Sequence, residues 1–548
     1  MSDEPQDRRV DRRAFLARMG ALGAAAALGT PFAASGSDGL GSAGLRMSGL
    51  EGAEEFWQEV KRTLPTTVDS PAELTASEAA ALVREGTLDP MELVEACLDR
   101  IGRWDERYLA FNTVLAEEAR SSARALNVEG DDGGLLRGVP LAVKDNFYTE
   151  GVLTTANSHI FRDFRPEWDA EAVRRLRSAG GIVIGKTQMG PLATTRALTP
   201  DGQVTTVNAW TPGNPSVSPG GSSSGSATAV AARMASSSIG TQTGGSITVP
   251  ALAQGLTGLK PTMGRVSLRG VIPLTYSRDH PGPIARDASD AALLLQVMAG
   301  PDPADPRTLG LPPVPDYLRA ATPQGRPEGA KIRWPTRLGV LPGWDAGDDP
   351  AASGRRAFLR EMEAAGVRMV EVTPSQRWNE LSSSLMNAVR LPERTEPFLE
   401  YLREDVRLFG VSLNSWMQGL FLSADEYLKG QRARHALLAS TLDEIFGQCD
   451  AVVQSGHVPF DMIGLPLLAL PTGHRQTEDG PRPHGILLGA PPFGEERLLS
   501  IAAAWQARTE HHRVRAPVLD ALREARALPP AGASRGRLSA EDVAERSQ

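Results

Sequence analysis

Cysteine is almost absent from this chain of 548 residues. The two cysteines that occur, Cys97 and Cys449, lie far apart in the sequence. They match neither the ligand spacing of a zinc site nor the even set of cysteines of a disulfide framework. The sequence leaves open whether the two pair, but it requires a fold that is stable without disulfide cross-links.

Blocks of positive charge are also missing. The chain has 58 Lys and Arg against 66 Asp and Glu, which gives a net charge of −8, and the basic residues form no cluster along the sequence. A nucleic-acid-binding protein or a protein that binds an anionic membrane surface usually carries such a cluster. We therefore expect neither kind of partner.

Apolar runs long enough to cross a bilayer are absent too. The nearest candidate is an Ala/Gly-rich run that ends near Ala34, and it is too short and too weakly apolar. It follows the paired arginines Arg12 and Arg13, and Phe15 and Leu16 come next. This arrangement resembles a twin-arginine export signal.

The export signal implies a protein that folds before export and works in the periplasm or outside the cell. Cleavage is expected between about Ala34 and Leu45, after which no stable membrane insertion remains. No cysteine follows the apolar run, so a lipoprotein anchor is not expected. The alternative interpretation is a basic, disordered N-terminus.

The remainder of the chain has the composition of a large globular protein. Hydrophobic residues make up 41% of the sequence, enough for a sizeable core. We predict a signal and small-residue segment over 1–45 and a linker with one short helix over 46–73. A single domain follows over 74–527, and then a polar, disordered tail over 528–548.

Within that domain, apolar strands alternate with amphipathic helices. Strands are predicted at 138–143, 181–184, 337–341, 367–372, 452–454, 467–470 and 485–488. Helices are predicted from Thr75, and at 89–104, 116–126, 169–179, 227–235, 289–299, 354–365 and 494–508. This alternation predicts an α/β fold: a large mixed β-sheet with helices on both faces. Two long helices, 378–391 and 424–446, form a helical insertion at about 375–447.

Two short motifs match catalytic patterns without the required context. Residues 180–187 match a phosphate-binding loop, but Ile182, Val183 and Ile184 read as the strand itself and not as an open loop. Residues 221–225 match the elbow that would make Ser223 a hydrolase nucleophile. The prolines before it exclude the strand that such an elbow needs. The histidines show no metal-ligand spacing, and no metal is predicted.

Three other segments form a more coherent set. Lys144 lies at the end of the first apolar strand, where burial would lower its pKa and make a neutral base available. Residues 218–226 read SPGGSSSGS, and Ser246 follows two glycines in a third segment, 240–250. Glycines there allow backbone N–H groups to converge on an oxyanion. Each segment alone has a structural alternative, either a solvent-facing lysine or a tight turn.

Together the three segments resemble the amidase signature family of serine hydrolases. The resemblance rests on VKDN at 143–146, PGGSSSGSA at 219–227, and GGSI followed by Pro250 and GLKPT at 258–262. It continues through GRVSLRGVIPL at 264–274 and GPIARDASDAALLL at 282–295. The closing segments are GLPLLALPTG at 464–473 and residues 486–506. These matches keep their order over about residues 74–508.

The resemblance implies a Ser–cis-Ser–Lys triad and a large mixed sheet. By motif, Ser246 is the nucleophile, Ser222 is the bridging serine after a cis peptide bond, and Lys144 is the base. The backbone N–H groups of Thr243, Gly244, Gly245 and Ser246 would form the oxyanion hole. Ser223 would support the network. The family needs no metal or organic cofactor.

Three departures from the family pattern lie near the nucleophile. Gln242 stands where Asp is usual, Thr248 where Arg is frequent, and Asp461 where Asn is common. They leave the substrate undefined but retain the three triad residues. We expect an exported amidase, a monomer or homodimer, that acts on a small-molecule amide and could also cleave esters. The alternatives are the glutaminase subunit of a tRNA-dependent amidotransferase, or a non-catalytic binding protein on the same scaffold.

Overall fold

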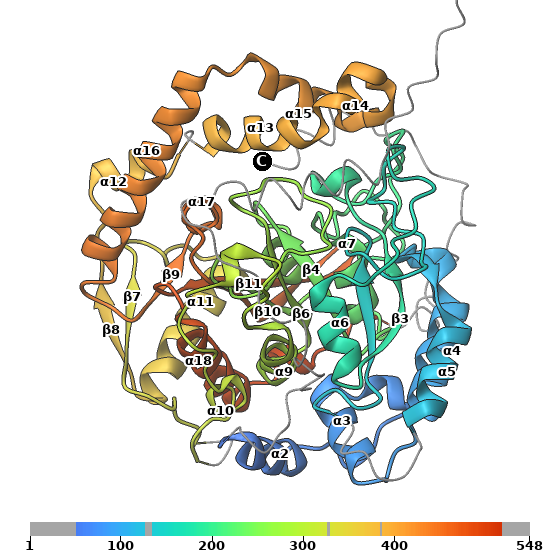
Figure 1. The fold of residues 1–548 in the computed structure, drawn as a ribbon. Helices are drawn as coiled ribbons and strands as arrows, with labels where there is room; N and C mark the ends of the chain where they lie inside the picture. The colour runs from blue at the N-terminus through green and yellow to red at the C-terminus, as the bar shows by residue number, and fades with distance from the viewer. Residues whose placement is uncertain (1–50, 127–133, 326–328, 384–385, 518–548) are drawn as a thin grey trace, which may run out of the picture.

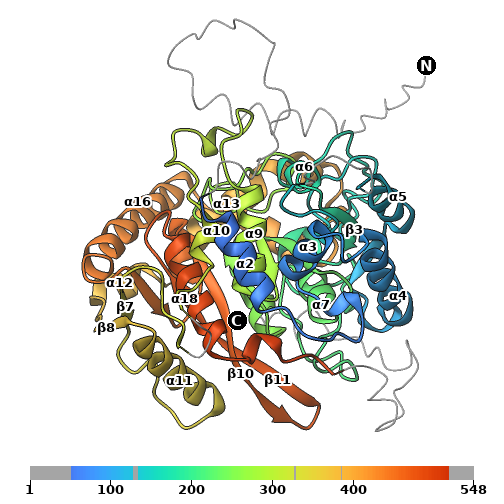
Figure 2. The same cartoon turned by 90° about the horizontal axis from the view of Figure 1, so that it is seen from below.

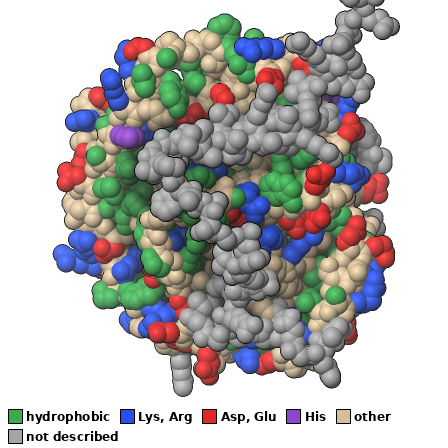
Figure 3. All heavy atoms as spheres, viewed as in Figure 1, with side chains coloured by type: hydrophobic (Ala, Val, Ile, Leu, Met, Phe, Trp, Pro, Cys, Tyr) green, Lys and Arg blue, Asp and Glu red, His purple; other side chains and the backbone are tan. Residues whose placement is uncertain are grey.

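The computed structural model describes residues 51–126, 134–325, 329–383 and 386–517. The expected export signal and the polar tail from 528 onward lie outside these residues. Among the described helices, none combines the length and the apolar character needed to cross a membrane. On the face shown in Figure 3, Lys and Arg side chains are interspersed with Asp and Glu.

The core of the molecule is one mixed sheet of 11 strands, in the order β1-β3-β2-β4-β6-β5-β10-β11-β9-β7-β8. Neighbouring strands are parallel in the pairs β2–β3, β2–β4, β7–β8 and β7–β9, and antiparallel elsewhere. The strands are β1 Phe111–Val114, β2 Pro140–Lys144, β3 Ile182–Thr187, β4 Ser237–Gln242, β5 Thr257–Lys260, β6 His280–Ala285, β7 Thr336–Val340, β8 Val367–Glu371, β9 Ala451–Gln454, β10 Leu467–Thr477 and β11 Gly480–Gly489. The predicted α/β class with a large mixed sheet is confirmed.

Both faces of the sheet are buried under helices. Along β2, Leu141 and Val143 belong to one apolar cluster and Ala142 to another, as expected when side chains alternate between faces. The first cluster includes side chains from α2 Ala53–Arg62, α3 Ala76–Arg84, α6 Glu171–Ser178, α9 Ala288–Met298, α10 Tyr317–Ala320, α11 Pro350–Ala364 and α18 Glu495–Arg508. The second includes side chains from α4 Pro90–Tyr108, α5 Ala116–Leu126, α7 Ser224–Ala231 and α8 Thr248–Ala253. Figures 1 and 2 show these helices, apart from α8, which is not labelled, around the sheet.

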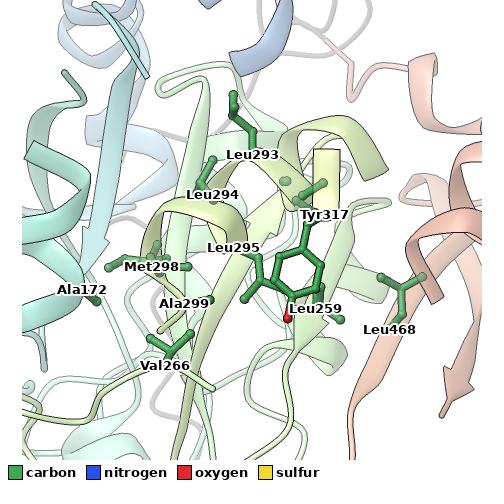
Figure 4. Close-up of a cluster of buried hydrophobic side chains, with 14 of the residues drawn as sticks. Ala172, Leu259, Val266, Leu293, Leu294, Leu295, Met298, Ala299, Tyr317 and Leu468 are labelled. Carbon is green, nitrogen blue, oxygen red and sulfur yellow. The ribbon is translucent and has the colours of Figure 1, made fainter. Parts of the chain in front are cut away.

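Helix α9 is at the centre of the first cluster. Its side chains Leu293, Leu294 and Leu295 are fully buried, near Leu259 of β5 and Tyr317 of α10 (Figure 4). The helix begins where the Asp287 side chain accepts the N–H of Asp290. Such a cap satisfies one of the free N–H groups at a helix start. The predicted helix over 289–299 is therefore confirmed to within one residue at each end.

The helical insertion differs from its prediction in detail. In place of one helix over 378–391, the structure has α12 Gln376–Leu381 and α13 Met386–Thr395, in which Pro392 lies within the helix. The shorter helices α14 Leu399–Glu404 and α15 Leu413–Met417 follow. The second long helix is α16 Ala424–Ser440, which continues into a π-helical turn, Thr441–Ile445. Helices α13 to α16 form an arc along one side of the sheet (Figure 1).

Four strands were not expected from the sequence: β1, β4, β5 and β6. Strand β4 reads SSIGTQ and has little apolar content, although all six residues are buried. Strand β6 contains Pro281 and Pro283, and proline is disfavoured inside a sheet because it has no N–H. The strand pairs with β4 from His280 to Ile284 but with β5 only at Ile284 and Ala285.

Candidate active site

Lys144 is the last residue of β2, in the interior of the sheet. Its side chain is fully buried, and its Nζ lies 2.8 Å from Ser222 Oγ, 2.8 Å from Thr241 Oγ1 and 3.3 Å from the Thr241 carbonyl oxygen. Among the described residues, no carboxylate forms an ion pair with it. Burial lowers the pKa of Lys144 to about 7, although the negative charge of Asp279 opposes the shift.

Ser222 follows two glycines, Gly220 and Gly221, at positions of the turn that disfavour any side chain. The peptide bond between Gly221 and Ser222 is cis, as the resemblance implies. Gly220 has φ of +76°, a conformation that favours glycine. A Cβ on Gly221 would lie 2.5 Å from the Thr195 carbonyl oxygen. The serine-rich stretch is therefore a packed turn at the start of α7 and not a spacer.

Ser246 lies in a second glycine turn, between β4 and α8. Its carbonyl oxygen accepts the N–H of Ser223 at 3.3 Å, which brings the two turns into contact. The residue is 6% exposed, and its hydroxyl makes no hydrogen bond to another described residue. Ser223 itself donates from Oγ to the Thr241 carbonyl at 3.4 Å. Lys144, Ser222 and Ser246 are thus brought together from segments up to 102 positions apart (246 − 144 = 102).

The expected oxyanion donors differ in availability. Gly245, with φ of +79°, donates its N–H to Asp461 Oδ2 at 2.9 Å, so this group is already used. In the described chain, the N–H groups of Thr243, Gly244 and Ser246 donate to no other residue. The geometry therefore leaves three of the four expected donors free, and gives Gly245 a different partner.

Gln242 and Asp461 form the support of this turn. The Gln242 amide nitrogen donates to Asp461 Oδ1 at 2.8 Å. Its amide oxygen accepts the N–H groups of Ile247 and Thr248, each at 2.9 Å, and the Thr248 hydroxyl at 3.2 Å. A neutral Gln242 can do this because it offers both a donor and an acceptor.

Asp461 carries the buried negative charge of the network. It lies in α17, Val458–Ile463, and its Oδ2 also contacts His457 Nδ1 at 2.8 Å. Lys260 Nζ lies 3.9 Å from Oδ1. Burial would raise the pKa of Asp461, but the bond from His457 and the nearby cations lower it to about 2.

Several neighbours of Lys144, Ser222 and Ser246 were not singled out from sequence. Thr241 and Asn146 are the main ones: Thr241 Oγ1 contacts Lys144 and accepts from Asn146 Nδ2 at 3.0 Å. Asn146 lies within the VKDN motif, so its position was a usable signal. His457 was not singled out either, because its place beside Asp461 depends on contacts that no local pattern reveals.

The two short motifs at 180–187 and 221–225 have the structures that their flanking residues predicted. Ile182, Val183 and Ile184 form part of strand β3, so residues 180–187 are not an open phosphate loop. Ser223 precedes α7 and is preceded by irregular chain, without the strand of a hydrolase elbow. Both cysteines are free and buried. No group of three or more potential metal ligands occurs within the described ranges.

Comparisons with known proteins agree with this geometry. The sequence pattern of the amidase family, described as "Amidase", matches residues 92–456. A glutamyl-tRNA(Gln) amidotransferase subunit of Azotobacter vinelandii is 36% identical over 496 residues, covering 81% of this chain and 99% of that protein. The corresponding protein of Moorella thermoacetica is 33% identical over 497 residues, covering 81% and 98%.

A solved structure gives the same result. The native peptide amidase of Stenotrophomonas maltophilia superposes with a TM-score of 0.63 at 30% identity, covering 83% of this chain and 99% of that one. The family pattern spans the segments that hold Lys144, Ser222 and Ser246. The chain belongs to the amidase family, whose enzymes hydrolyse the C–N bonds of amides.

Proposed function

We propose that this protein is an amidase that hydrolyses a linear amide through an acyl-enzyme on Ser246. The observation that carries the proposal is the contact of 2.8 Å between the fully buried Lys144 Nζ and Ser222 Oγ. A buried lysine that has no carboxylate partner among the described residues favours its neutral form, and a neutral amine can accept a proton.

The proton path follows from the contacts of Lys144. A neutral amine has two N–H groups, which suffice for the two oxygens of Thr241. Its lone pair is then left for the Ser222 hydroxyl. Ser222 passes its proton to Lys144 and takes the proton of Ser246 as Ser246 Oγ attacks the carbonyl carbon. The reverse transfer protonates the leaving amine, and water then cleaves the acyl-enzyme.

The turn at residues 243–247, which we call the nucleophile turn, stabilises the negative oxygen of the tetrahedral intermediate. The N–H groups of Thr243, Gly244 and Ser246 are available for this, whereas the N–H of Gly245 holds Asp461. In other hydrolases, loss of one such donor costs about 3 kcal/mol of transition-state stabilisation. Ser223 supports the turn through its bond to the Ser246 carbonyl.

The test is hydrolysis of aliphatic, aryl and peptide amides, and of esters, by the wild-type protein and by Ser246→Ala. We expect the variant to lose at least about 10³-fold in turnover, because the nucleophile is gone. Ser216→Ala is the matched control, since Ser216 is an exposed serine in the same serine-rich region. Equal rates for wild type and Ser246→Ala contradict the mechanism.

A second candidate is the glutaminase subunit of an amidotransferase, and the sequence relatives favour it. The relatives from Azotobacter and Moorella are named as subunits of such an enzyme, and the match covers them almost completely. Ammonia release from glutamine by the purified chain, with and without added partner subunits of an amidotransferase, separates the two. Full activity on simple amides without partners favours the amidase; activity only in a complex favours the amidotransferase.

We also propose export by the twin-arginine pathway, on the strength of Arg12, Arg13 and the apolar run after them. The test is fractionation of cells that express the full chain or the Arg12→Lys/Arg13→Lys variant. Accumulation of wild type outside the cytoplasm, abolished in the variant, supports export. A wild-type protein that stays in the cytoplasm contradicts it.

A further inference from the structure

A small pocket away from the nucleophile turn is lined by three arginines and one carboxylate. Arg100 comes from α4, Arg233 from the chain just after α7, and Arg515 from the closing segment of the described chain. Glu73 ends the 3₁₀ turn Pro71–Glu73 and lies among them. The pocket has a volume of about 20 Å³ and adjoins open solvent. One water needs about 10–15 Å³ on this measure, so the pocket suits a small ion and not a bulky organic group.

Arg233 occupies a backbone position that favours glycine. It directly follows Ala232, the C-cap of α7, and has φ of +61°, in the left-handed region that most side chains avoid. The residue is nevertheless buried, with 6% of its surface exposed. A large cation is thus kept where both the backbone conformation and the loss of water oppose it. This combination indicates that the guanidinium itself is needed at this place.

The Arg233 guanidinium uses few of its donors. Nη1 donates to the carbonyl oxygens of Ala231 at 3.2 Å and Val230 at 3.4 Å. Nε is buried and donates to no described group, although Glu73 Oε2 lies 3.5 Å away. Nη2 makes no hydrogen bond within the described part of the chain. At most two of the five N–H groups of Arg233 are therefore used, and at least three are left for another acceptor.

The single carboxylate does not balance the three arginines. Glu73 Oε1 accepts a hydrogen bond from Arg100 Nη1 at 3.0 Å, whereas Oε2 is buried and accepts none from the described residues. Arg515 Nε lies 3.4 Å from that Oε2. Asp69 lies 3.9 Å from Arg515 Nη1, but its side chain is 98% exposed, so water screens its charge. The pocket thus has two more positive charges than buried negative ones (3 − 1 = 2).

A further cation adds to this excess of positive charge. Burial, followed by the charge of Arg286, lowers the pKa of Arg233 to about 9, and Glu73 opposes the shift. A buried cation without a full counter-charge is costly, and a bound anion removes that cost. Phosphate carries close to two negative charges at neutral pH, which matches the excess in the pocket. Its tetrahedral oxygens can also face three guanidinium groups from three segments, whereas the two oxygens of a carboxylate lie in one plane.

We propose that Arg100, Arg233 and Arg515 form a phosphate-binding site, which takes the free ion or the phosphate group of a small monoester. Guanidinium groups bind phosphate through paired N–H donors, which gives both strength and orientation. Ser222 precedes the start of α7 and Arg233 follows its end, so this site is separate from the proposed catalytic residues. The bound ion joins α4, the chain after α7 and the closing segment, and its binding therefore stabilises the fold.

The experiment measures thermal unfolding in sodium phosphate and in sodium chloride of equal ionic strength. At about ten times Kd, phosphate should raise the melting temperature of the wild type by at least about 1 °C over chloride. Arg233→Gly should lose this rise. The variant removes the cation, and glycine adopts the φ of this position without strain, so it is expected to fold. Arg103→Gln, at an exposed arginine of α4, is the matched control and should keep the rise.

Titration calorimetry with inorganic phosphate and with glycerol 3-phosphate identifies the source of the phosphate group. We expect one site per chain in the wild type and none in Arg233→Gly, and the ligand with the lower Kd is the better model of the natural one. No phosphate binding by the wild type overturns the site. Equal binding by wild type and Arg233→Gly places the ion elsewhere and also overturns it. An equal rise in melting temperature with sodium acetate overturns the assignment to phosphate.

Discussion

Desolvation decides the chemistry of individual residues in this site. Lys144 and Lys186 are both fully buried at neighbouring strands, but Lys186 has Asp145 at 3.2 Å whereas Lys144 faces hydroxyl and carbonyl oxygens. The difference in partners separates their roles. Burial lowers the pKa of both lysines, and Asp145 opposes that shift at Lys186. Lys144 has no carboxylate within ion-pair distance among the described residues, and its pKa of about 7 makes the neutral amine accessible near neutral pH.

A pH dependence follows from the Lys144 pKa of about 7. The base must be neutral, so kcat/KM should rise with pH through about 7 and level off above it; protonation at lower pH removes the acceptor. The measurement is a pH–rate profile of amide hydrolysis. His457→Asn is the control, because a midpoint that persists in this variant cannot come from that imidazole. A profile flat from pH 6 to 8 contradicts the assignment of Lys144.

The Gln242–Asp461 pair accounts for two of the departures from the family pattern. The carboxylate expected at 242 is replaced by one at 461, and the two side chains contact each other at 2.8 Å. One buried negative charge is thus retained near the turn that holds Ser246, but Asp461 carries it and residue 242 does not. Thr248 contributes its N–H and hydroxyl to the same amide oxygen, where an arginine would bring a charge that Gln242 cannot balance.

An exchange of the two residues tests this interpretation. Gln242→Asp alone places two carboxylates in one buried site. Asp461→Asn alone leaves a single side-chain oxygen for the N–H groups of Gln242 and Gly245, which donate to different oxygens of Asp461. Each should destabilise the protein by about 1–3 kcal/mol and reduce kcat/KM. The double variant restores a single carboxylate. Its loss in free energy of unfolding should be at least about 1 kcal/mol smaller than the sum of the losses in the two single variants. Denaturant unfolding and kinetics of the wild type, the two single variants and the double variant measure this. If the losses of the single variants simply add in the double variant, the interpretation of 242 and 461 as an exchanged pair is wrong.

At the scale of elements, the β4–α8 connection positions Ser246, the proposed nucleophile. It crosses from the sheet to a helix within five residues, Thr243 to Ile247, and Gly245 takes the left-handed conformation needed to make that turn. The turn is packed from outside, since a Cβ on Gly245 would lie 2.8 Å from His457 Nε2 and 2.8 Å from Val249 Cγ2. Gly244 meets no atom within 4 Å.

Substitution of the two glycines should therefore have unequal effects. Gly245→Ala forces both a strained φ and a clash, and we expect a lower melting temperature and at least about a 100-fold loss of kcat, because Ser246 is displaced. Gly244→Ala should keep the melting temperature of the wild type. Thermal unfolding of both variants, with kinetics of the first, is the measurement. Similar melting temperatures for the two contradict this account of the turn.

The elements that the sequence predicted have strong apolar patterns, whereas the strands that it missed do not. Strands β2, β3 and β7 and helices α5 and α9 carry strong apolar patterns and lie close to their expected ranges. Strand β4 is small and polar, and β6 contains two prolines. Their extended conformation comes from hydrogen bonds to neighbouring strands and not from local preference.

At the scale of the whole molecule, residues 51–73 are part of the packed body. Helix α2 buries Phe56, Trp57 and Val60 against the core, and the Gly52 N–H donates to Asp316 at the start of α10. This segment contacts residues more than 250 positions away in the chain. The sequence predicted one short helix within a linker over 46–73, but it did not predict the contact of this segment with α10.

Truncation of Phe56 measures how firmly this segment is attached. Phe56 is 1% exposed, and Phe56→Ala should lower the free energy of unfolding by about 3–5 kcal/mol through lost burial and the cavity left behind. Gln58→Ala, on the exposed side of the same helix, should change it little. Denaturant midpoints of the two variants give the comparison. Equal midpoints show that α2 contributes little to the stability of the fold.

The sequence by itself determined the α/β class, because apolar strand and helix patterns depend on neighbouring residues. Its resemblance to the amidase signature family predicted Lys144, Ser222 and Ser246 as the catalytic residues. The tertiary structure decided which of these groups are free to act. Asp461 binds Gln242 across 219 positions and accepts the Gly245 N–H, and the Ser277 N–H donates to Glu393 of α13 in the insertion. Such contacts depend on packing between distant segments, and burial then sets their charge and hydrogen-bonding state.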